Sequence, residues 1–308
     1  MKHVTDEMVD RLVDPAAAQR VLEEALRQFG RGEAAMQERV RTEAAGVKLS
    51  TLGAVIPGQQ VAGAKVYTTI AGRFSFVILL FSAEDGRPLA SFDAGAITRL
   101  RTAACSVIAA RRLARPHART LALLGAGVQG QAHAVQFCEA FGGIGRIRVF
   151  DPHLPAAAAD ALQRRCGVPV ELVHDAGDAV SDADIVVTAS RSATPLFGGE
   201  RLPPGCFVAA IGSSLPHTRE LDDTALRRAS LIAVEWKRQT LREAGDLVQA
   251  APDALQPPGK VVELADLVTG QVPGRRRDDE VTLYKSVGVG LQDVALAGWA
   301  WRRLQEAG

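Results

Sequence analysis

Residues 119–130 read RTLALLGAGVQG, and this stretch decides the predicted fold. Residues 121–124 form a short, uninterrupted apolar run, which is typical of a strand buried on both faces of a parallel sheet. Gly125, Gly127 and Gly130 follow with the spacing G-x-G-x-x-G, and a helical pattern comes next. In this motif the first glycine turns the chain, the second lets the backbone approach a pyrophosphate, and the third lets the helix pack on the strand. The sequence therefore predicts a dinucleotide-binding turn, with phosphate held at a helix N-terminus.

An acidic residue at the end of the next predicted strand supports this interpretation. Residues 146–150 predict that strand, and Asp151 follows it directly. The motif expects an acid about 20 residues beyond its first glycine, where the carboxylate accepts a hydrogen bond from the ribose 2′-hydroxyl. A structural turn without a ligand is the alternative, but strand, glycines, helix, strand and acid all occur in order. Because a carboxylate there repels a 2′-phosphate, we expect NAD(H) and regard NADP(H) as less favoured.

Composition limits the class of protein. The chain has 308 residues, enough for two domains, and its 47% apolar and 23% charged residues are typical of a soluble globular protein. The net charge of +1 gives no sequence-independent hold on nucleic acid. The densest basic run, residues 275–277, is followed directly by the acidic residues 278–280, which indicates a compensated surface loop.

Cysteine usage and hydropathy indicate the compartment. Cys105, Cys138, Cys166 and Cys206 are far apart and form no C-x-x-C motif, which favours a reduced protein over a disulfide scaffold. The histidines are scattered as well, so no zinc site is expected. The N-terminus lacks an apolar signal core and no stretch reaches membrane-spanning length. We therefore expect a cytoplasmic protein that binds neither nucleic acid nor membrane.

The first third of the chain predicts an α+β arrangement. Thr5 and Asp14 are placed as helix N-caps, with a proline directly after Asp14 where its missing N–H costs nothing. Further on, residues 61–66 and 74–81 form short apolar runs between glycine- and proline-containing turns. These runs predict strands joined by hairpins.

The remainder predicts a doubly wound α/β domain. A helix over residues 98–114 is stopped by Pro116, so the domain boundary is placed near residue 115. Beyond the first two strands, further strand candidates alternate with helices: 170–173, 184–189, 206–211 and 230–234. The final helix, residues 291–304, is expected to pack back on the first domain. The predicted fold is therefore α/β, with a Rossmann domain over 116–287 and an α+β domain formed by 1–115 with 288–308.

Two basic residues of the first domain could carry chemistry. Lys65 lies on a strand among small and apolar residues, and burial would lower its pKa towards the range of a general acid or base. An outward-facing edge lysine explains the same pattern, so both interpretations stay open. Arg101 could bind a carboxylate through its fork of donors. Other arginines share its helix, so the pattern alone favours a surface arginine.

A longer stretch carries a resemblance to a known family. Residues 86–134 read GRPLASFDAGAITRLRTAACSVIAARRLARPHARTLALLGAGVQGQAHA and resemble the ornithine cyclodeaminase/μ-crystallin family, with its G-x-P-L turn, R-T-A-A helix, L-A-R-P and G-x-G-x-Q elements. Residues 208–223 and 281–297 are similar to the family's nicotinamide-side loop and closing segment. The resemblance runs nearly without a break over residues 41–299. It implies a homodimeric NAD(P)-dependent enzyme whose N-terminal domain supplies the substrate pocket and the dimer sheet.

The resemblance also implies roles for individual residues. Lys65 matches the family's catalytic lysine and Arg101 its carboxylate-binding arginine. Arg41 matches a second carboxylate-binding arginine, with Arg39 as a neighbouring rival. Motif and resemblance together indicate these dinucleotide-binding residues: Gly125, Ala126, Gly127, Val128, Gln129, Asp151, Thr188, Ser190, Gly212 and Ser286.

Two departures from the family pattern bear on the reaction. Ser214 stands where ornithine cyclodeaminases have an aspartate, and a serine is a far poorer base. The μ-crystallin branch, which reduces cyclic ketimines, is similar to this chain in having a serine at that catalytic position. Residues 67–81, YTTIAGRFSFVILLF, lack the family's P-x-N and G-L-P elements and are several residues shorter. The substrate therefore stays open.

Three functions remain at this point. The first is hydride transfer at the Cα–N bond of an amino or cyclic imino acid, by an imine (ketimine) reductase or amino-acid dehydrogenase. The second is ornithine cyclodeaminase, which converts L-ornithine to L-proline and ammonia; there Asp222 or Glu220 would replace the missing aspartate. The third is a dinucleotide-binding protein without turnover.

Overall fold

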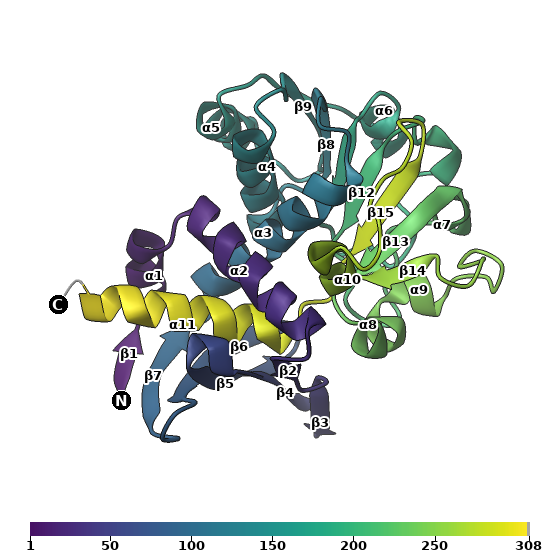
Figure 1. Ribbon diagram of the computed structural model, residues 1–308. Coiled ribbons are helices and arrows are strands. Elements are labelled where there is room, and N and C mark those ends of the chain that lie inside the picture. Colours follow the sequence, from purple (N-terminus) through teal and green to yellow (C-terminus); the bar gives the residue numbers. More distant parts are fainter. Residues whose placement is uncertain (307–308) are drawn as a thin grey trace. The chain divides into compact units, whose positions relative to one another are not determined.

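The computed structural model describes residues 1–306, and its chain divides into two compact units. One unit consists of Met1–Cys105 together with the chain from Gly288 onward, and the other of Ser106–Val287. The division falls inside helix α3 (Gly95–Leu113), whereas the boundary predicted from the sequence lies just after this helix. Figure 1 shows both units, each with its own sheet.

The first unit contains a seven-stranded sheet in the order β1-β7-β6-β5-β4-β2, with β3 paired to β4. Only β1 is parallel to its neighbour; the other pairs are antiparallel. The predicted strands 61–66 and 74–81 lie within β5 and β6. The two are joined by a tight turn in which Ala71 and Gly72 both have positive φ, as a type I′ turn requires. The strand bounds are β1 (Lys2–Val4), β2 (Ala35–Met36), β3 (Val40–Ala44), β4 (Val47–Ile56), β5 (Val61–Ile70), β6 (Arg73–Ser82) and β7 (Pro88–Asp93).

Three helices complete the first unit together with the start of α3. Helices α1 (Asp6–Leu12) and α2 (Pro15–Gly30) begin at the predicted N-caps, where Thr5 accepts from the Met8 N–H and Asp14 from the Ala17 N–H. Helix α11 (Gly290–Glu306) lies across β4, β5 and β6 and packs beside α2 (Figure 1). It buries one face of the sheet, on which the register aligns Leu52, Lys65 and Ile78.

The opposite face of this sheet carries exposed apolar side chains. The strand register places them on the face that α11 does not cover, and they are Val40, Val47, Leu49, Val55, Ile70 and Phe81. Each is between 36% and 51% exposed. A contiguous apolar surface of this kind marks an interaction site more often than a surface that stays in water.

The second unit contains an eight-stranded, fully parallel sheet in the order β10-β9-β8-β11-β12-β15-β13-β14. All of the strands predicted from the sequence are present, and the predicted fold class is confirmed. Two strands were missed, the edge strand β14 and the central strand β15. In β15, Thr282 and Lys285 interrupt the apolar run although both are buried. The bounds are β8 (Thr120–Leu124), β9 (Arg146–Phe150), β10 (Val170–Leu172), β11 (Ile185–Thr188), β12 (Phe207–Ala210), β13 (Ala229–Val234), β14 (Val261–Glu263) and β15 (Val281–Lys285).

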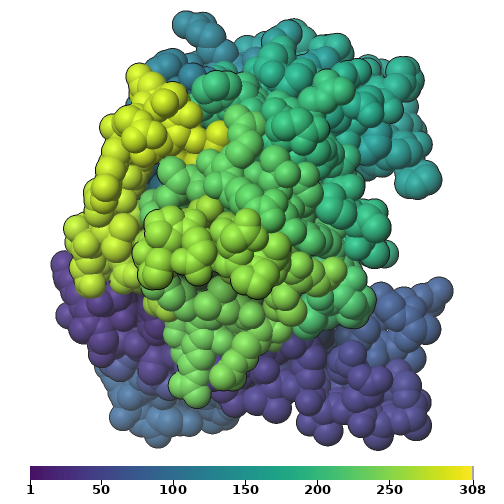
Figure 2. Space-filling model, turned by 90° about the vertical axis from the view of Figure 1, so that its right-hand side faces the viewer, coloured from purple at the N-terminus to yellow at the C-terminus, as the bar shows by residue number. Residues whose placement is uncertain are grey.

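Helices cover both faces of this second sheet, and α7 to α9 form much of the green surface of the unit in Figure 2. Their bounds are α4 (Val128–Ala140), α5 (Ala156–Cys166), α6 (Ala176–Val180), α7 (Asp223–Arg228), α8 (Lys237–Glu243), α9 (Gly245–Val248) and α10 (Leu264–Thr269). Helix α4 begins directly after Gly127, which is its N-cap. The glycine motif therefore forms the N-terminus of this helix. None of the helices within residues 1–306 has the length and apolar character needed to cross a membrane.

Candidate functional site

Lys65 faces inward from β5 and is only 3% exposed. Its Nζ donates to Thr98 Oγ1 at 2.5 Å and lies 3.4 Å from Asp293 Oδ1. The same amine sits 4.5 Å from the ring centroid of Phe76. Of the two interpretations that the sequence left open, the structure supports the buried lysine and not the edge lysine.

The surroundings of Lys65 shift its pKa towards neutrality. Burial removes water from the ammonium and lowers the pKa, the charge of Asp293 raises it, and the charge of Arg101 lowers it again. The result is a pKa of about 8, down from 10.5. An amine with this pKa exchanges a proton readily near physiological pH, as a general acid or base must.

Arg101 is also buried, at 6% exposure, and is not the surface arginine that the pattern alone favoured. Its Nη1 donates to Gln292 Oε1 at 2.8 Å, and its Nε lies 3.4 Å from Asp293 Oδ1. Within residues 1–306, Arg101 Nε and Asp293 Oδ2 have no hydrogen-bond partner. Lys65, Arg101 and Asp293 form a buried group, here called the amine cluster. Two of its polar atoms therefore make no hydrogen bond with the described residues.

The second carboxylate-binding arginine was predicted as Arg41, with Arg39 as its rival. In the structure, Arg39 Nη2 donates to the Gly288 carbonyl at 2.8 Å, and its charge helps to lower the pKa of Lys65. Arg41 lies on β3 opposite Ser50. The positive charge of Arg39 therefore acts on Lys65 in the amine cluster. A role for Arg41 stays a prediction.

Sequence reasoning missed three partners of the amine cluster: Thr98, Gln292 and Asp293. Asp293 is fully buried at the start of α11. The available signal was an acid inside the apolar run LQDVALA, because a buried carboxylate in such a run needs a cationic partner. The pattern could not name Lys65 as that partner, since 228 positions of chain separate the two residues.

In the second unit, the glycine motif has the steric requirements that the sequence predicted. Gly125 has a φ of +91°, and a Cβ there would lie 2.7 Å from the Ala189 carbonyl oxygen. A Cβ at Gly130 would lie 2.0 Å from the carbonyl oxygen of Gly125. A Cβ at Gly127 would meet nothing within 4 Å, so space is open beside the N-terminus of α4. Open space at that point fits a pyrophosphate held by helix N–H groups.

A cavity of about 610 Å³ adjoins this turn, at the carboxyl ends of β8, β9 and β11. Asp151 lines it and accepts hydrogen bonds from the N–H groups of Ala126 at 2.8 Å and His153 at 2.9 Å. Val128 is 69% exposed at the start of α4, and Gln129 follows it. Cavity size, acid and turn all fit the nucleoside end of a dinucleotide.

A buried carboxylate joins three of the predicted cofactor residues. Glu220 accepts from Thr188 Oγ1 at 2.8 Å, from the N–H and the hydroxyl of Ser190 at 2.7 Å each, and from the N–H groups of Gly212 at 2.7 Å and Ser213 at 3.2 Å. It is fully buried. The structure thus brings Thr188, Ser190 and Gly212 together at the strand ends, because all three donate to Glu220. The sequence did not reveal that Glu220 is their common acceptor.

The other predicted residues of this unit lie in the loops after β12 and β15. Ser214 is half-buried in the loop after β12. Asp222 is the N-cap of α7 and accepts from the N–H groups of Ala225 and Gly199. Ser286 is 2% exposed and donates to Glu235 Oε1 at 2.5 Å. Since Asp222 and Glu220 both hold backbone N–H groups, neither is a spare carboxylate near Ser214.

Comparison with known proteins gives matches over the full length of the chain. The family described as the ornithine cyclodeaminase/mu-crystallin family matches residues 1–307. The chain is 33% identical over 269 residues to a Delta(1)-pyrroline-2-carboxylate reductase of Bacillus cereus, which covers 86% of this chain and 79% of that relative.

Two solved structures are similar to the fold. A probable ornithine cyclodeaminase from Bordetella pertussis Tohama I is 60% identical, with a TM-score of 0.97 over 100% of this chain and 98% of that one. The Delta(1)-pyrroline-2-carboxylate reductase of Thermococcus litoralis, in complex with NADH and L-proline, is 25% identical, with a TM-score of 0.94 over 100% and 98% of the two chains. The resemblance and the fold class inferred from the sequence are confirmed.

Proposed function

Because the chain belongs to the ornithine cyclodeaminase/mu-crystallin family, we propose that it is an NAD(H)-dependent reductase of cyclic imino acids. The observation that carries this proposal is the buried amine cluster, in which Lys65 has a pKa of about 8 beside the buried guanidinium of Arg101. Two of the similar proteins are named as reductases of Delta(1)-pyrroline-2-carboxylate, one of them in complex with NADH.

Arg101 is proposed to bind the substrate carboxylate. Its guanidinium is held from two sides, by Gln292 and Asp293, and this fixes the plane of its donors. Arg39, tied to the Gly288 carbonyl, adds positive charge, and Arg41 is the further candidate. A carboxylate held in this way aligns the adjoining Cα=N bond for reaction.

Lys65 is proposed to supply the proton. When bound, the reduced nicotinamide supplies a hydride, which forms the new C–H bond at Cα. The Lys65 ammonium gives its proton to the ring nitrogen as the electrons of the C=N bond move there. Imino acid, NADH and one proton thus give the cyclic amino acid and NAD⁺. Asp293 favours the charged lysine before transfer, and Thr98 Oγ1 holds the amine in place.

We propose NAD(H) as the cofactor in preference to NADP(H). Asp151 is proposed to bind the ribose. The pyrophosphate is proposed to lie against the glycine turn, which consists of Gly125, Ala126, Gly127, Val128 and Gln129. The carboxylate of Asp151 lines the cavity, where it would repel a 2′-phosphate. Thr188, Ser190, Gly212, Ser214 and Ser286 belong to the proposed nicotinamide side.

The test is the oxidation of NADH in the presence of Δ1-pyrroline-2-carboxylate or Δ1-piperideine-2-carboxylate. Arg101→Met should raise KM about 10- to 100-fold, because charge-assisted hydrogen bonds to the carboxylate are lost. Arg99→Met is the matched control, since Arg99 lies on the same helix and pairs with the exposed Asp10. NADH binding without oxidation by either imine would contradict the proposal and support a protein without turnover.

Ornithine cyclodeaminase is the second candidate, because a 60% identical protein carries that description as probable. The residues argue against it: Ser214 stands in place of an aspartate, and Glu220 and Asp222 are both occupied by backbone N–H groups. Release of ammonia from L-ornithine with catalytic NAD⁺ and no net NADH would decide for this candidate.

A homodimer is proposed from the open face of the first sheet. Its exposed apolar side chains include Val55 and Phe81, and pairing with a second copy would remove them from water. Light scattering after size-exclusion chromatography should give twice the chain mass, and Phe81→Asp should weaken the dimer. A cytoplasmic location stays a prediction.

A further inference from the structure

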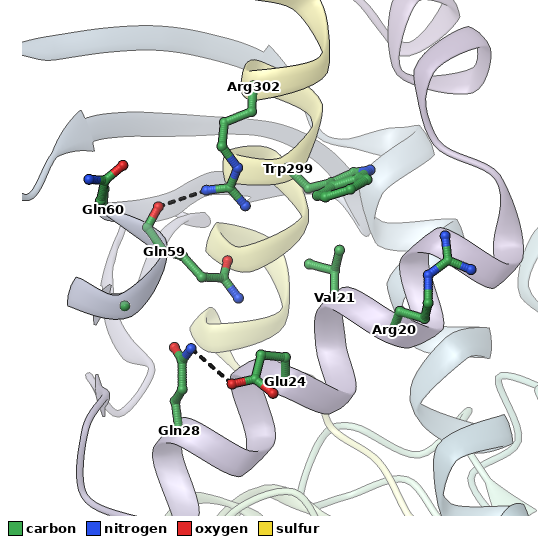
Figure 3. A pocket seen from close by; sticks show the side chains of 9 residues that line it. Arg20, Val21, Glu24, Gln28, Gln59, Gln60, Trp299 and Arg302 are labelled. Carbon is green, nitrogen blue, oxygen red and sulfur yellow. Dashed lines mark hydrogen bonds between the residues drawn. The ribbon is translucent and has the colours of Figure 1, made fainter.

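A second cavity, of about 450 Å³, lies in the first unit between α2, α11 and the turn η1 (Pro57–Gln59). This volume is within the usual range for small-molecule sites. Figure 3 shows Glu24 and Gln28 at one end and Trp299 and Arg302 at the other, with the Gln59 side chain between them. None of these residues belongs to the amine cluster.

Two buried amides at this cavity lack a partner for their oxygen atoms. Gln28 and Gln59 are 9% and 8% exposed. Gln28 Nε2 donates to Glu24 Oε1 at 3.2 Å, but no described residue donates to Oε1 of Gln28 or of Gln59. A buried oxygen without a donor costs stability, and native structures seldom leave one unexplained. Because the terminal torsion of an amide side chain is soft, both oxygens can turn towards a ligand that brings donors.

The other end of the cavity presents donors. Trp299 Nε1 is buried and has no acceptor among residues 1–306. Arg302 donates to the Gln59 carbonyl at 2.7 Å through Nη1 and stacks 5.9 Å from the Trp299 ring (Figure 3). Burial lowers the pKa of Arg302, which means that its charge is poorly solvated there. An indole N–H beside a guanidinium suits a carboxylate.

We propose that this cavity is a second binding site, for a free α-amino acid in its zwitterionic form. The ammonium group lies against Gln28, Gln59 and Glu24, and the carboxylate against Trp299 and Arg302. Arg302 brings positive charge to the carboxylate end. The ammonium end offers acceptors, namely the two amide oxygens and the carboxylate of Glu24, which also pairs with Arg27 through Oε2. The proposal goes beyond the reductase and does not depend on it, because binding at this site needs neither the cofactor nor turnover.

The experiment is calorimetric titration of the full chain carrying Arg101→Met, with L-alanine as the probe. The substitution disables the carboxylate site of the amine cluster, so the remaining saturable heat reports the second cavity. Acetate and ethylammonium, each with half of the ligand's charge, should bind at least tenfold more weakly. If Arg101→Met does not fold, the difference between the wild-type chain and Gln59→Leu gives the same information.

Two substitutions identify the cavity. In the same background, Gln59→Leu and Trp299→Phe should each weaken L-alanine binding about tenfold or more. The melting temperature of Gln59→Leu should be unchanged or higher, because leucine removes the buried amide oxygen that has no partner. That of Trp299→Phe should be somewhat lower, because ring volume beside Arg302 is lost. Arg303→Met is the matched surface control, since Arg303 is exposed and pairs with Glu306. It should bind as the background does.

Absence of saturable heat with L-alanine, or unchanged affinity in both cavity variants, would overturn the second site. Failure of the reductase proposal would appear elsewhere, as an absence of NADH oxidation with the imines. The two proposals therefore fail independently.

Discussion

The amine cluster of the first unit and the Glu220 site of the second unit are both buried and polar, but their bonding differs. Glu220 accepts hydrogen bonds from four residues and holds two strand ends together. In the amine cluster, Arg101 Nε and Asp293 Oδ2 have no hydrogen-bond partner among residues 1–306, although Nε lies 3.4 Å from Asp293 Oδ1. A carboxylate whose oxygens all accept hydrogen bonds stabilises the fold, whereas a cluster with unfilled hydrogen-bonding atoms and a lowered lysine pKa is suited to chemistry.

Lys65→Met should have the largest effect on activity. Removing a general acid costs about 10²- to 10⁴-fold, so kcat/KM for imine reduction should fall by that order. Methionine has a similar shape and is no worse to bury, so the folded chain should persist. Lys48→Met, on the same face of the sheet, removes an exposed pair with Glu43 and serves as the control. Equal activity of the Lys65 and Lys48 variants would show that the amine cluster has no chemical role in the reaction.

Two glycines of the turn differ in the space around them: Gly130 lies against backbone, and Gly127 borders open space. Gly130→Ala would place a Cβ 2.0 Å from a backbone oxygen and should destabilise the second unit by several kcal/mol, about 3 or more. Gly127→Ala enters open space at a φ of −71°, which alanine adopts without strain. It should melt as the wild type does but bind NADH about tenfold more weakly, because the backbone no longer approaches the pyrophosphate. Thermal melting and calorimetry measure the two effects; unchanged NADH affinity in Gly127→Ala would contradict the assigned phosphate site.

Local pattern was enough to predict the second unit's turn. Strand β8, the glycines and Asp151 lie within one continuous stretch, and each has a steric or electrostatic task that residue type reveals. The amine cluster was different. The burial of Lys65 depends on α11 and Asp293, far along the chain, so pattern alone left both interpretations of the lysine open. Glu220 was missed as a centre for the same reason, because its donors come from the ends of two different strands, β11 and β12.

Glu220→Gln should affect stability more than chemistry. Glutamine has the same shape as glutamate, but its NH₂ group replaces one acceptor oxygen. This donor would then face the N–H or hydroxyl donors that now bind Glu220. The cost should be about 2 kcal/mol in the free energy of unfolding, measured by urea denaturation. Folded enzyme should retain kcat within about threefold, on the scale of RT. Asp223→Asn is a suitable control, because Asp223 pairs with Arg219 near the surface. A loss of kcat comparable to that of Lys65→Met, with stability unchanged, would show that Glu220 is no structural anchor.

The pH profile should show the smallest change, and it tests the cause of the Lys65 pKa. A proton donor with a pKa of about 8 is charged below that pH, so kcat/KM for imine reduction should fall about tenfold per pH unit above it. Oxidation of the amino acid needs the neutral amine and should rise through the same pH. Asp293 is the attraction that raises the pKa against burial, so Asp293→Asn should move the break to lower pH. Asp10→Asn, on the exposed surface, should leave it in place. If the break in the pH profile of Asp293→Asn stays at the wild-type pH, the titrating group is not Lys65. Lys65 would then not be the proton donor.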